Sequence, residues 1–259
     1  VKTDDGIHMN WPNFFRRGRW WRGEERGFIP NKDYGKEMDD IKSFFQNSFA
    51  YGKASEKEKN LPFTAMQGLF DGSQRLYIHA NGEKEMTDAV TLAKEMGVKH
   101  VVIVGGYRAN KIADFLKQHN IPVLVEHTHS LPQFDDDDYD LPYKLPKLLL
   151  DAGLLVALQN EDAANFATRN LGFYAGQTVA QGLDKETALQ LITGNTAKIL
   201  GIDDMYGTLE EGKSATLFIS EGDALDMRTN ILTKAYIDGR DISLETHQTE
   251  LWKRYMGKY

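Results

Sequence analysis

The sequence predicts an α/β protein whose central sheet is built of parallel strands. Three observations lead to this prediction. Short, continuous apolar runs, typical of strands buried on both faces, recur in the middle of the chain. A segment with helical apolar spacing separates most of these runs from the next. Glycines follow several of these segments, where the chain has to turn. Single helices between strands favour parallel pairing, because parallel strands need a crossover connection.

The expected strands and helices alternate after residue 75. The strands are the apolar runs Leu76–His79, Val101–Val104, Val123–Glu126 and Leu155–Leu158. The helices that separate them are Lys84–Met96, Lys111–His119 and a segment around Pro146–Ala152, and a further helix is expected over Lys185–Leu200. A doubly wound open sheet and a (β/α) barrel both satisfy this pattern, so strand count alone leaves the two folds open.

The two ends of the chain have different patterns. Residues 1–74 lack long periodic strands and are predicted as an irregular and helical lead-in with one helix over Lys36–Tyr51. In residues 207–245 the apolar period changes to two, which predicts a small module of short strands. Residues 246–259 are predicted as a C-terminal helix.

Composition and charge exclude several classes of protein. The 259 residues are 41% hydrophobic, which is enough to form a core and excludes global disorder. The net charge of −7 argues against attraction of the whole molecule to nucleic acid or anionic lipid. The Arg-rich and aromatic segment 14–22 resembles single-strand binders, but acidic residues follow it directly, so we expect no nucleic acid partner. No apolar run is long enough to span a membrane.

The absence of cysteine limits the chemistry of any site. It excludes a disulfide framework, a thiolate metal site and a cysteine nucleophile, so a metal would have to bind His, Asp or Glu. No Gly-x-Ser-x-Gly motif indicates a serine nucleophile. The chain begins with Val and has no apolar leader, so both the cytoplasm and the periplasm or exterior, after removal of a signal peptide, stay open.

Polar residues follow the expected strands at their carboxyl ends, where α/β enzymes place their chemistry. They are His79, the pair His127 and His129, and the pair Glu161 and Asp162. Gly105-Gly106 follows another strand but lacks the third glycine of a dinucleotide motif. The acidic run Asp135 to Asp138 lacks the spaced ligands of a calcium loop and is interpreted as a solvated loop.

The last hundred residues contain a set of motifs that resembles one known family, the metal-dependent amidohydrolase superfamily, in its imidazolonepropionase-like branch. The motifs are Arg169-Asn170-Leu171, Ala175-Gly176, Val179 to Leu183, Glu186 to Leu189, Thr193 to Gly201 and Gly207 to Leu217. The resemblance implies a (β/α)8 barrel joined to a β-sandwich. This chain would then supply the C-terminal half of the barrel, strands five to eight, in residues 75–206, and part of the sandwich in residues 207–245.

The resemblance also implies a site and a reaction. His79 takes the place of the fifth-strand metal ligand, and the pair Glu161 and Asp162 takes the place of the eighth-strand aspartate, with Asp162 preferred. A divalent metal, zinc by its ligand type, would activate water to hydrolyse a C–N bond in an amide, peptide or cyclic amide. The carboxylate would accept the proton. The alternative for His79 is a hydrogen-bonded histidine that binds no metal. The alternative for Glu161 and Asp162 is an acidic N-cap of the following helix.

Three departures from the family pattern qualify this site. No His-x-His pair precedes the expected strands, Gly105-Gly106 occupies the sixth-strand histidine position, and the one His-x-His pair follows the seventh strand. We assign His129 to the metal, and His127, Arg169 and Asn170 to a small-molecule or peptide substrate.

Two hypotheses follow. In the first, the chain is the C-terminal part of an amidohydrolase and associates, as an oligomer, with a chain or fragment that supplies strands one to four and the rest of the sandwich. In the second, it belongs to a degenerate relative that binds no metal and acts as a binding or scaffold protein.

Overall fold

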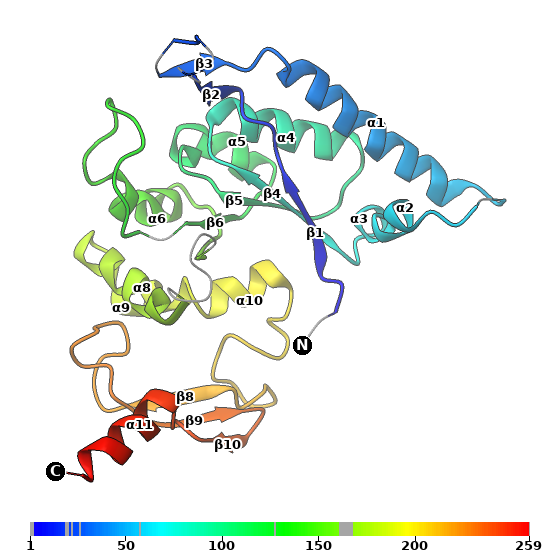
Figure 1. The fold of residues 1–259 in the computed structure, drawn as a ribbon. Helices are drawn as coiled ribbons and strands as arrows, with labels where there is room; N and C mark the ends of the chain where they lie inside the picture. Colours follow the sequence, from blue (N-terminus) through cyan, green and yellow to red (C-terminus); the bar gives the residue numbers. More distant parts are fainter. Residues whose placement is uncertain are drawn as a thin grey trace.

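The fold is centred on one parallel sheet (Figure 1). The computed structural model describes residues 3–18, 21, 23–25, 27–56, 58–126, 128–160 and 168–258. Five strands form the sheet in the order β1-β4-β5-β6-β7, and every neighbouring pair is parallel. The strands are β1 Gly6–Asn10, β4 Arg75–Ala80, β5 Val101–Gly105, β6 Val123–Val125 and β7 Val156–Leu158. The α/β class and the parallel pairing of the four predicted strands are therefore confirmed.

Helices connect and flank these strands. They are α1 Tyr34–Lys53, α2 Leu61–Ala65, α3 Gln67–Asp71, α4 Glu83–Glu95, η2 Ala109–Ile112, α5 Ala113–Gln118, α6 Leu141–Asp151, η3 Thr168–Asn170, α8 Leu171–Ala180, α9 Lys185–Gln190 and α10 Gly194–Leu200. The single helix predicted over Lys185–Leu200 is divided into α9 and α10. The Leu191 carbonyl accepts a hydrogen bond from the Leu158 backbone N–H of β7, and this pairing lies at the break.

Residues 1–74 contain strands that the periodicity did not predict. Strand β1 pairs with β4 along its whole length, from Gly6 opposite Arg75 to Asn10 opposite His79. Strands β2 (Phe15–Arg17) and β3 (Phe28–Pro30) form an antiparallel pair beyond it. The lead-in is thus partly a component of the central sheet. The division of the chain at residues 74, 206 and 245 stays a prediction.

The two faces of the sheet differ in what covers them. Leu76 and Ile78 of β4 are fully buried in the main core, together with apolar residues of α4, α5, α6 and α8. Tyr77 lies between them in sequence and points to the opposite face, because side chains alternate along a strand. There it joins a smaller cluster that includes Val102 and Ile199. We call this second face the inner face.

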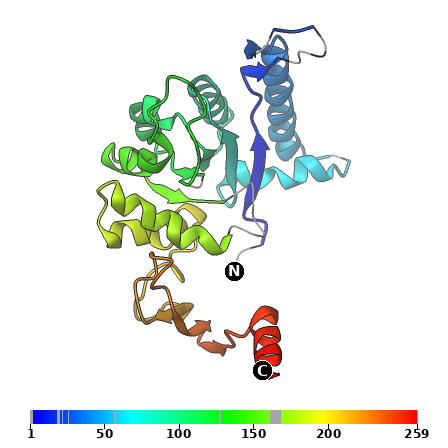
Figure 2. The same cartoon turned by 60° about the vertical axis from the view of Figure 1, so that its left-hand side comes forward.

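The C-terminal part is a separate small sheet. Strands β8 (Leu217–Ser220), β9 (Leu232–Ile237) and β10 (Arg240–Ile242) pair antiparallel in the order β10-β9-β8, and α11 (His247–Met256) follows them. This module lies at the opposite end of the molecule from the β2–β3 hairpin (Figures 1 and 2). The predicted change to period two is confirmed, whereas membership of a β-sandwich stays a prediction. None of the described helices has the length and apolar character needed to cross a membrane.

Asn195 ties α10 to the central sheet. Its side-chain Nδ2 donates a 2.9 Å hydrogen bond to the Val156 carbonyl of β7, and the residue is buried. We expect Asn195→Ala to lower the free energy of unfolding by about 1–3 kcal/mol, because the carbonyl loses its side-chain donor inside the protein. Urea denaturation measures the change. The exposed Asn47 of α1 provides the control, and an equal loss in Asn47→Ala would contradict this role for Asn195.

Candidate active site

Two histidines from neighbouring strands face each other on the inner face. Nδ1 of His8, on β1, lies 2.9 Å from Nε2 of His79, on β4. The register pairs His8 with Tyr77 and Asn10 with His79, so the two histidines are diagonal neighbours across the strand pair. His79 is half-buried and His8 is exposed. The pair therefore forms a polar centre open to solvent near the carboxyl end of β4.

Tyr77 supports the ring of His8. The two rings stack with centroids 4.7 Å apart and planes inclined by 14°. The Tyr77 hydroxyl donates a 2.5 Å hydrogen bond to Oδ2 of Asp5. Burial, together with this carboxylate, raises the pKa of Tyr77, which keeps the phenol protonated as a donor at neutral pH. Tyr77 is thus a fixed platform that positions His8.

A chain of hydrogen bonds fixes the segment that follows β1. The Trp11 backbone N–H donates to the His79 carbonyl at 3.1 Å. The buried Trp11 indole donates to the Tyr34 hydroxyl at 3.0 Å, which donates to Asp88 at 2.8 Å. Burial raises the pKa of Tyr34, so this hydroxyl also keeps its proton. These bonds connect the segment after β1 with β4, α1 and α4, and they restrain the backbone that follows His8.

His129 lies in different surroundings from His79. Its ring is exposed and packs edge-on against Tyr174 of α8, with centroids 4.8 Å apart. The preceding Thr128 is buried and donates through Oγ1 to the Tyr174 carbonyl at 3.2 Å. Within the described part of the chain, no hydrogen bond or ring contact joins His129 to His79. Its assignment as a metal ligand stays a prediction.

The other predicted site residues are only partly visible. His127, Glu161 and Asp162 lie outside the described residues. Arg169 and Asn170 belong to the short η3 turn before α8, where Arg169 is exposed and Asn170 is half-buried. Asn170 occupies the N-cap position of α8 but makes no side-chain capping bond. The Asn170 amide and the Arg169 guanidinium therefore lie at the start of α8. Their contact with substrate stays a prediction.

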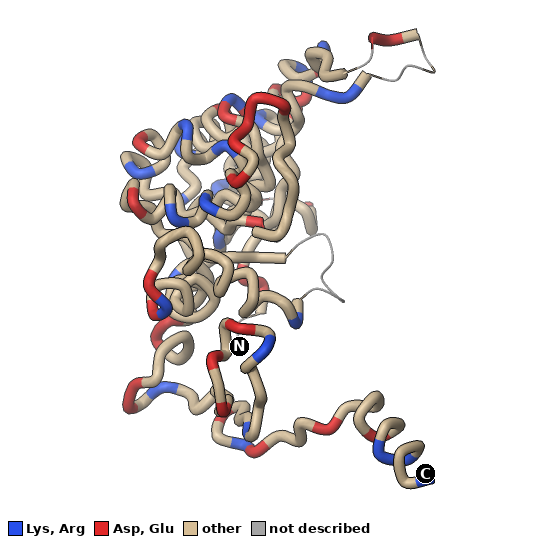
Figure 3. Tube along the Cα trace, turned by 90° about the vertical axis from the view of Figure 1, so that its left-hand side faces the viewer, with Lys and Arg blue, Asp and Glu red and all other residues tan. Residues whose placement is uncertain are grey.

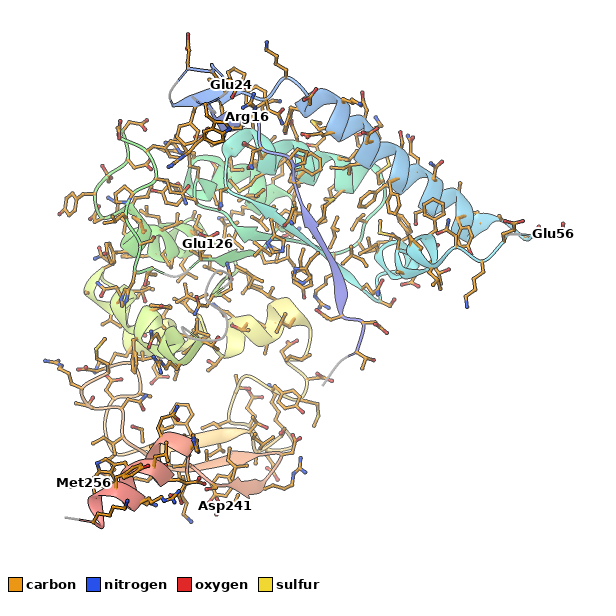
Figure 4. All side chains as sticks on the ribbon, viewed as in Figure 1. Arg16, Glu24, Glu56, Glu126, Asp241 and Met256 are labelled. Carbon is orange, nitrogen blue, oxygen red and sulfur yellow. The ribbon has the colours of Figure 1, made fainter. Side chains whose placement is uncertain are left out.

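Two polar residues of this region have no role in the site predicted from the sequence. His8 has no role in the sequence prediction, because the apolar periodicity does not predict β1. Glu126 was included in a strand; it follows β6 directly, at the carboxyl end of the sheet, and lines a small pocket with Tyr107 and Ser130. Figure 4 shows Glu126 beside the end of β6, well separated from Arg16 and Glu24 of the hairpin. An acid directly after a buried strand was the signal that could have identified it.

The acidic loop between β6 and α6 is held by basic residues. Asp137 accepts hydrogen bonds from the Tyr107 hydroxyl at 2.7 Å and from Arg108 at 2.9 Å. Lys144 pairs with Asp138 at 2.6 Å and lowers the pKa of that carboxyl. Figure 3 shows this stretch as a continuous acidic segment among mixed charges. The ion pairs therefore hold the acidic run as a loop beside the carboxyl ends of the strands.

The histidine pair has the donor chemistry of a partial metal site. The observed separation of 2.9 Å between the two ring nitrogens is that of a direct hydrogen bond, and it is shorter than the roughly 3.3 Å between two nitrogens bound to one tetrahedral zinc. Among the described residues, no group of three His, Asp or Glu side chains surrounds one point. The two rings would therefore have to move apart to share one metal ion, and further ligands would have to come from other residues.

Comparison with known protein families gives a match for the C-terminal part of the chain. Residues 144–244 match the model of the amidohydrolase family. This segment, less than half of the chain, is similar to that family. The match confirms the resemblance to the superfamily and covers the motifs on which it was based. The imidazolonepropionase-like branch stays a prediction. A search of curated proteins gave no match.

Several solved structures share the fold of this chain. An amidohydrolase from Thermotoga maritima MSB8 superposes with a TM-score of 0.76 at 24% identity, over 94% of this chain and 63% of that protein. A prolidase complexed with N-methylphosphonate-L-proline has a TM-score of 0.56 at 12% identity, over 93% and 68% of the two chains. A Xaa-Pro dipeptidase has 0.53 at 20% identity, over 70% and 47%. The chain thus spans less than two thirds of the Thermotoga maritima protein.

Proposed function

We propose that this chain is the C-terminal part of an amidohydrolase-type hydrolase that cleaves a C–N bond in an amide, a peptide or a cyclic amide. The observation that carries the proposal is the pair of imidazoles from His8 and His79, presented on the inner face of a parallel sheet. The amidohydrolase match over residues 144–244 supports it. The prolidase and dipeptidase neighbours support a peptide or amino-acid amide as one substrate class.

In this proposal, β4 to β7 are barrel strands five to eight, and β8 to β10 are part of the β-sandwich. Because β1 pairs with β4 on the side away from β5, it takes the place of strand four. His79 then lies at the fifth-strand position and His8 lies beside it. The proposed partner has to supply three strands rather than four.

The site residues have distinct proposed roles. His79 holds a divalent metal, zinc by its ligand type, and His8 either shares the metal or orients His79 through the hydrogen bond between their rings. When bound, such a metal polarises the substrate carbonyl and acidifies water. Asp162, or its neighbour Glu161, accepts the proton of the attacking water. Arg169, Asn170 and His127 contact the substrate, and His129 is a further proposed ligand.

A second candidate function is a degenerate relative that binds a partner or ligand without metal. It is favoured by Gly105-Gly106 at the position that the resemblance gives to the sixth-strand histidine. The two candidates differ in metal content.

Metal analysis of the assembled protein separates the candidates. If the chain belongs to a hydrolase, we expect about one to two zinc ions per barrel by mass spectrometry of the metals, as in other catalytic zinc sites. A chelator should abolish hydrolysis of a panel of dipeptides and cyclic amides, and added zinc should restore it. A folded assembly with no metal and no hydrolysis would instead favour the scaffold.

A further inference from the structure

A second pocket lies at the other end of the sheet from the histidine pair. It has a volume of about 520 Å³ and is lined by the segments that lead into β5, β6 and β7. These strands are neighbours in the parallel sheet, so their amino ends and the preceding loops lie side by side. The start of β4 and the end of α10 also contribute to the lining. The pocket is therefore built by the sheet itself rather than by one loop.

The lining of this pocket is strongly basic. It contains the side chains of Arg75, Lys94, Lys99, Lys117 and Lys198, which come from separate segments of the chain. His100 and His119 also line it, and none of the described residues that line it is Asp or Glu. This concentration of positive charge occurs in a chain with a net charge of −7. It is thus a local feature and does not reflect the overall composition.

Protein groups compensate only part of this charge. Arg75 has a carboxylate partner in Asp5, at 3.8 Å, and Lys117 donates to the Ala152 carbonyl at 2.9 Å. Among the described residues, Lys94, Lys99 and Lys198 form no ion pair. Gathering like charges in a concave site is unfavourable, and a bound anion would offset their repulsion. The uncompensated lysines therefore indicate an anionic ligand.

The size and walls of the pocket indicate what kind of anion it would take. Its volume lies in the range of small-molecule sites. The walls between the basic residues are apolar, with Val101, Ile121 and Leu154 among them. Lysine binds phosphate groups as a mobile point charge, and several lysines match an anion with several charges. We propose that this pocket binds an organic di- or triphosphate, with the phosphates on the lysines and the organic part on the apolar wall.

Isothermal titration calorimetry tests this proposal on the full chain at about 0.1 M salt, where distant charges are largely screened. The probes are pyrophosphate and ATP, with citrate as a non-phosphate anion. We expect pyrophosphate and ATP to bind one site and ATP to bind more tightly. Lys117→Gln combined with Lys198→Gln should weaken both by about tenfold or more, because two charged donors are lost.

The control replaces two exposed lysines at the start of α1 and just before it, Lys36→Gln combined with Lys32→Gln, which changes the net charge by the same amount. It should leave both affinities unchanged. Circular dichroism should confirm that both variants stay folded, as expected for exposed side chains. No binding of either phosphate to the wild type, citrate binding as tight as pyrophosphate, or an equal loss in the control would overturn the proposal. None of these readouts depends on hydrolysis, so the proposed function is tested independently.

Discussion

Replacing His79 with alanine is expected to lower kcat/KM for metal-dependent hydrolysis by at least about a hundredfold while changing the free energy of unfolding by less than about 1 kcal/mol. The imidazole is half-buried on the inner face and hydrogen-bonds to His8, outside the main apolar core. Its loss therefore removes the proposed metal ligand without opening a cavity in that core. Steady-state kinetics, metal analysis and urea denaturation of the same preparation measure the three quantities.

His247→Ala is a suitable control, because His247 is exposed on α11, in the C-terminal module. It should keep both metal and activity. His8→Ala adds a graded comparison: a residue that only orients His79 should cost about 10–100-fold in metal affinity. If His79→Ala unfolds the protein while metal bound per folded molecule is unchanged, His79 is a structural histidine and the proposed site is wrong.

The sequence predicted most of the central sheet because its strands are buried on both faces. Val101 to Val104 is apolar at every position, and the structure buries each of these side chains. Strand β1 has a different pattern. In Gly6-Ile7-His8-Met9-Asn10, apolar residues alternate with polar ones, because one side packs on the core and the other carries the site. An alternation over only five residues is too short to be distinguished from an irregular segment.

The sequence predicts only those site residues that lie at the ends of predicted strands. His79 was found because it ends an apolar run. Its partner His8 precedes it by 71 residues, and no local pattern indicates that β1 and β4 are neighbours. The role of Tyr77 depends on the same pairing, since its ring supports His8. Long-range pairing is therefore the physical information that the sequence, read segment by segment, did not contain.

We expect this chain to associate tightly with a chain or fragment that completes the barrel and the sandwich. Strands β1 and β7 each have a single neighbour in the described sheet, so each leaves one edge of N–H and C=O groups outside strand pairing. The small C-terminal sheet adds a second reason. Phe218 and Ile219 of β8 are consecutive and point to opposite faces, yet they are 50% and 48% exposed. A sheet with apolar side chains exposed on both faces requires a covering surface.

Size-exclusion chromatography with light scattering measures this association, and intact mass spectrometry identifies the components. Phe218→Asp should weaken the complex, because it places a charge in the proposed interface, whereas Leu131→Asp, at a loop residue that is 82% exposed, should not. A stable monomer of 29.4 kDa with one cooperative thermal transition would contradict the prediction. Such a monomer would mean that residues of this chain cover the edges of β1 and β7, and the assignment of its strands to one half of a barrel would then be wrong.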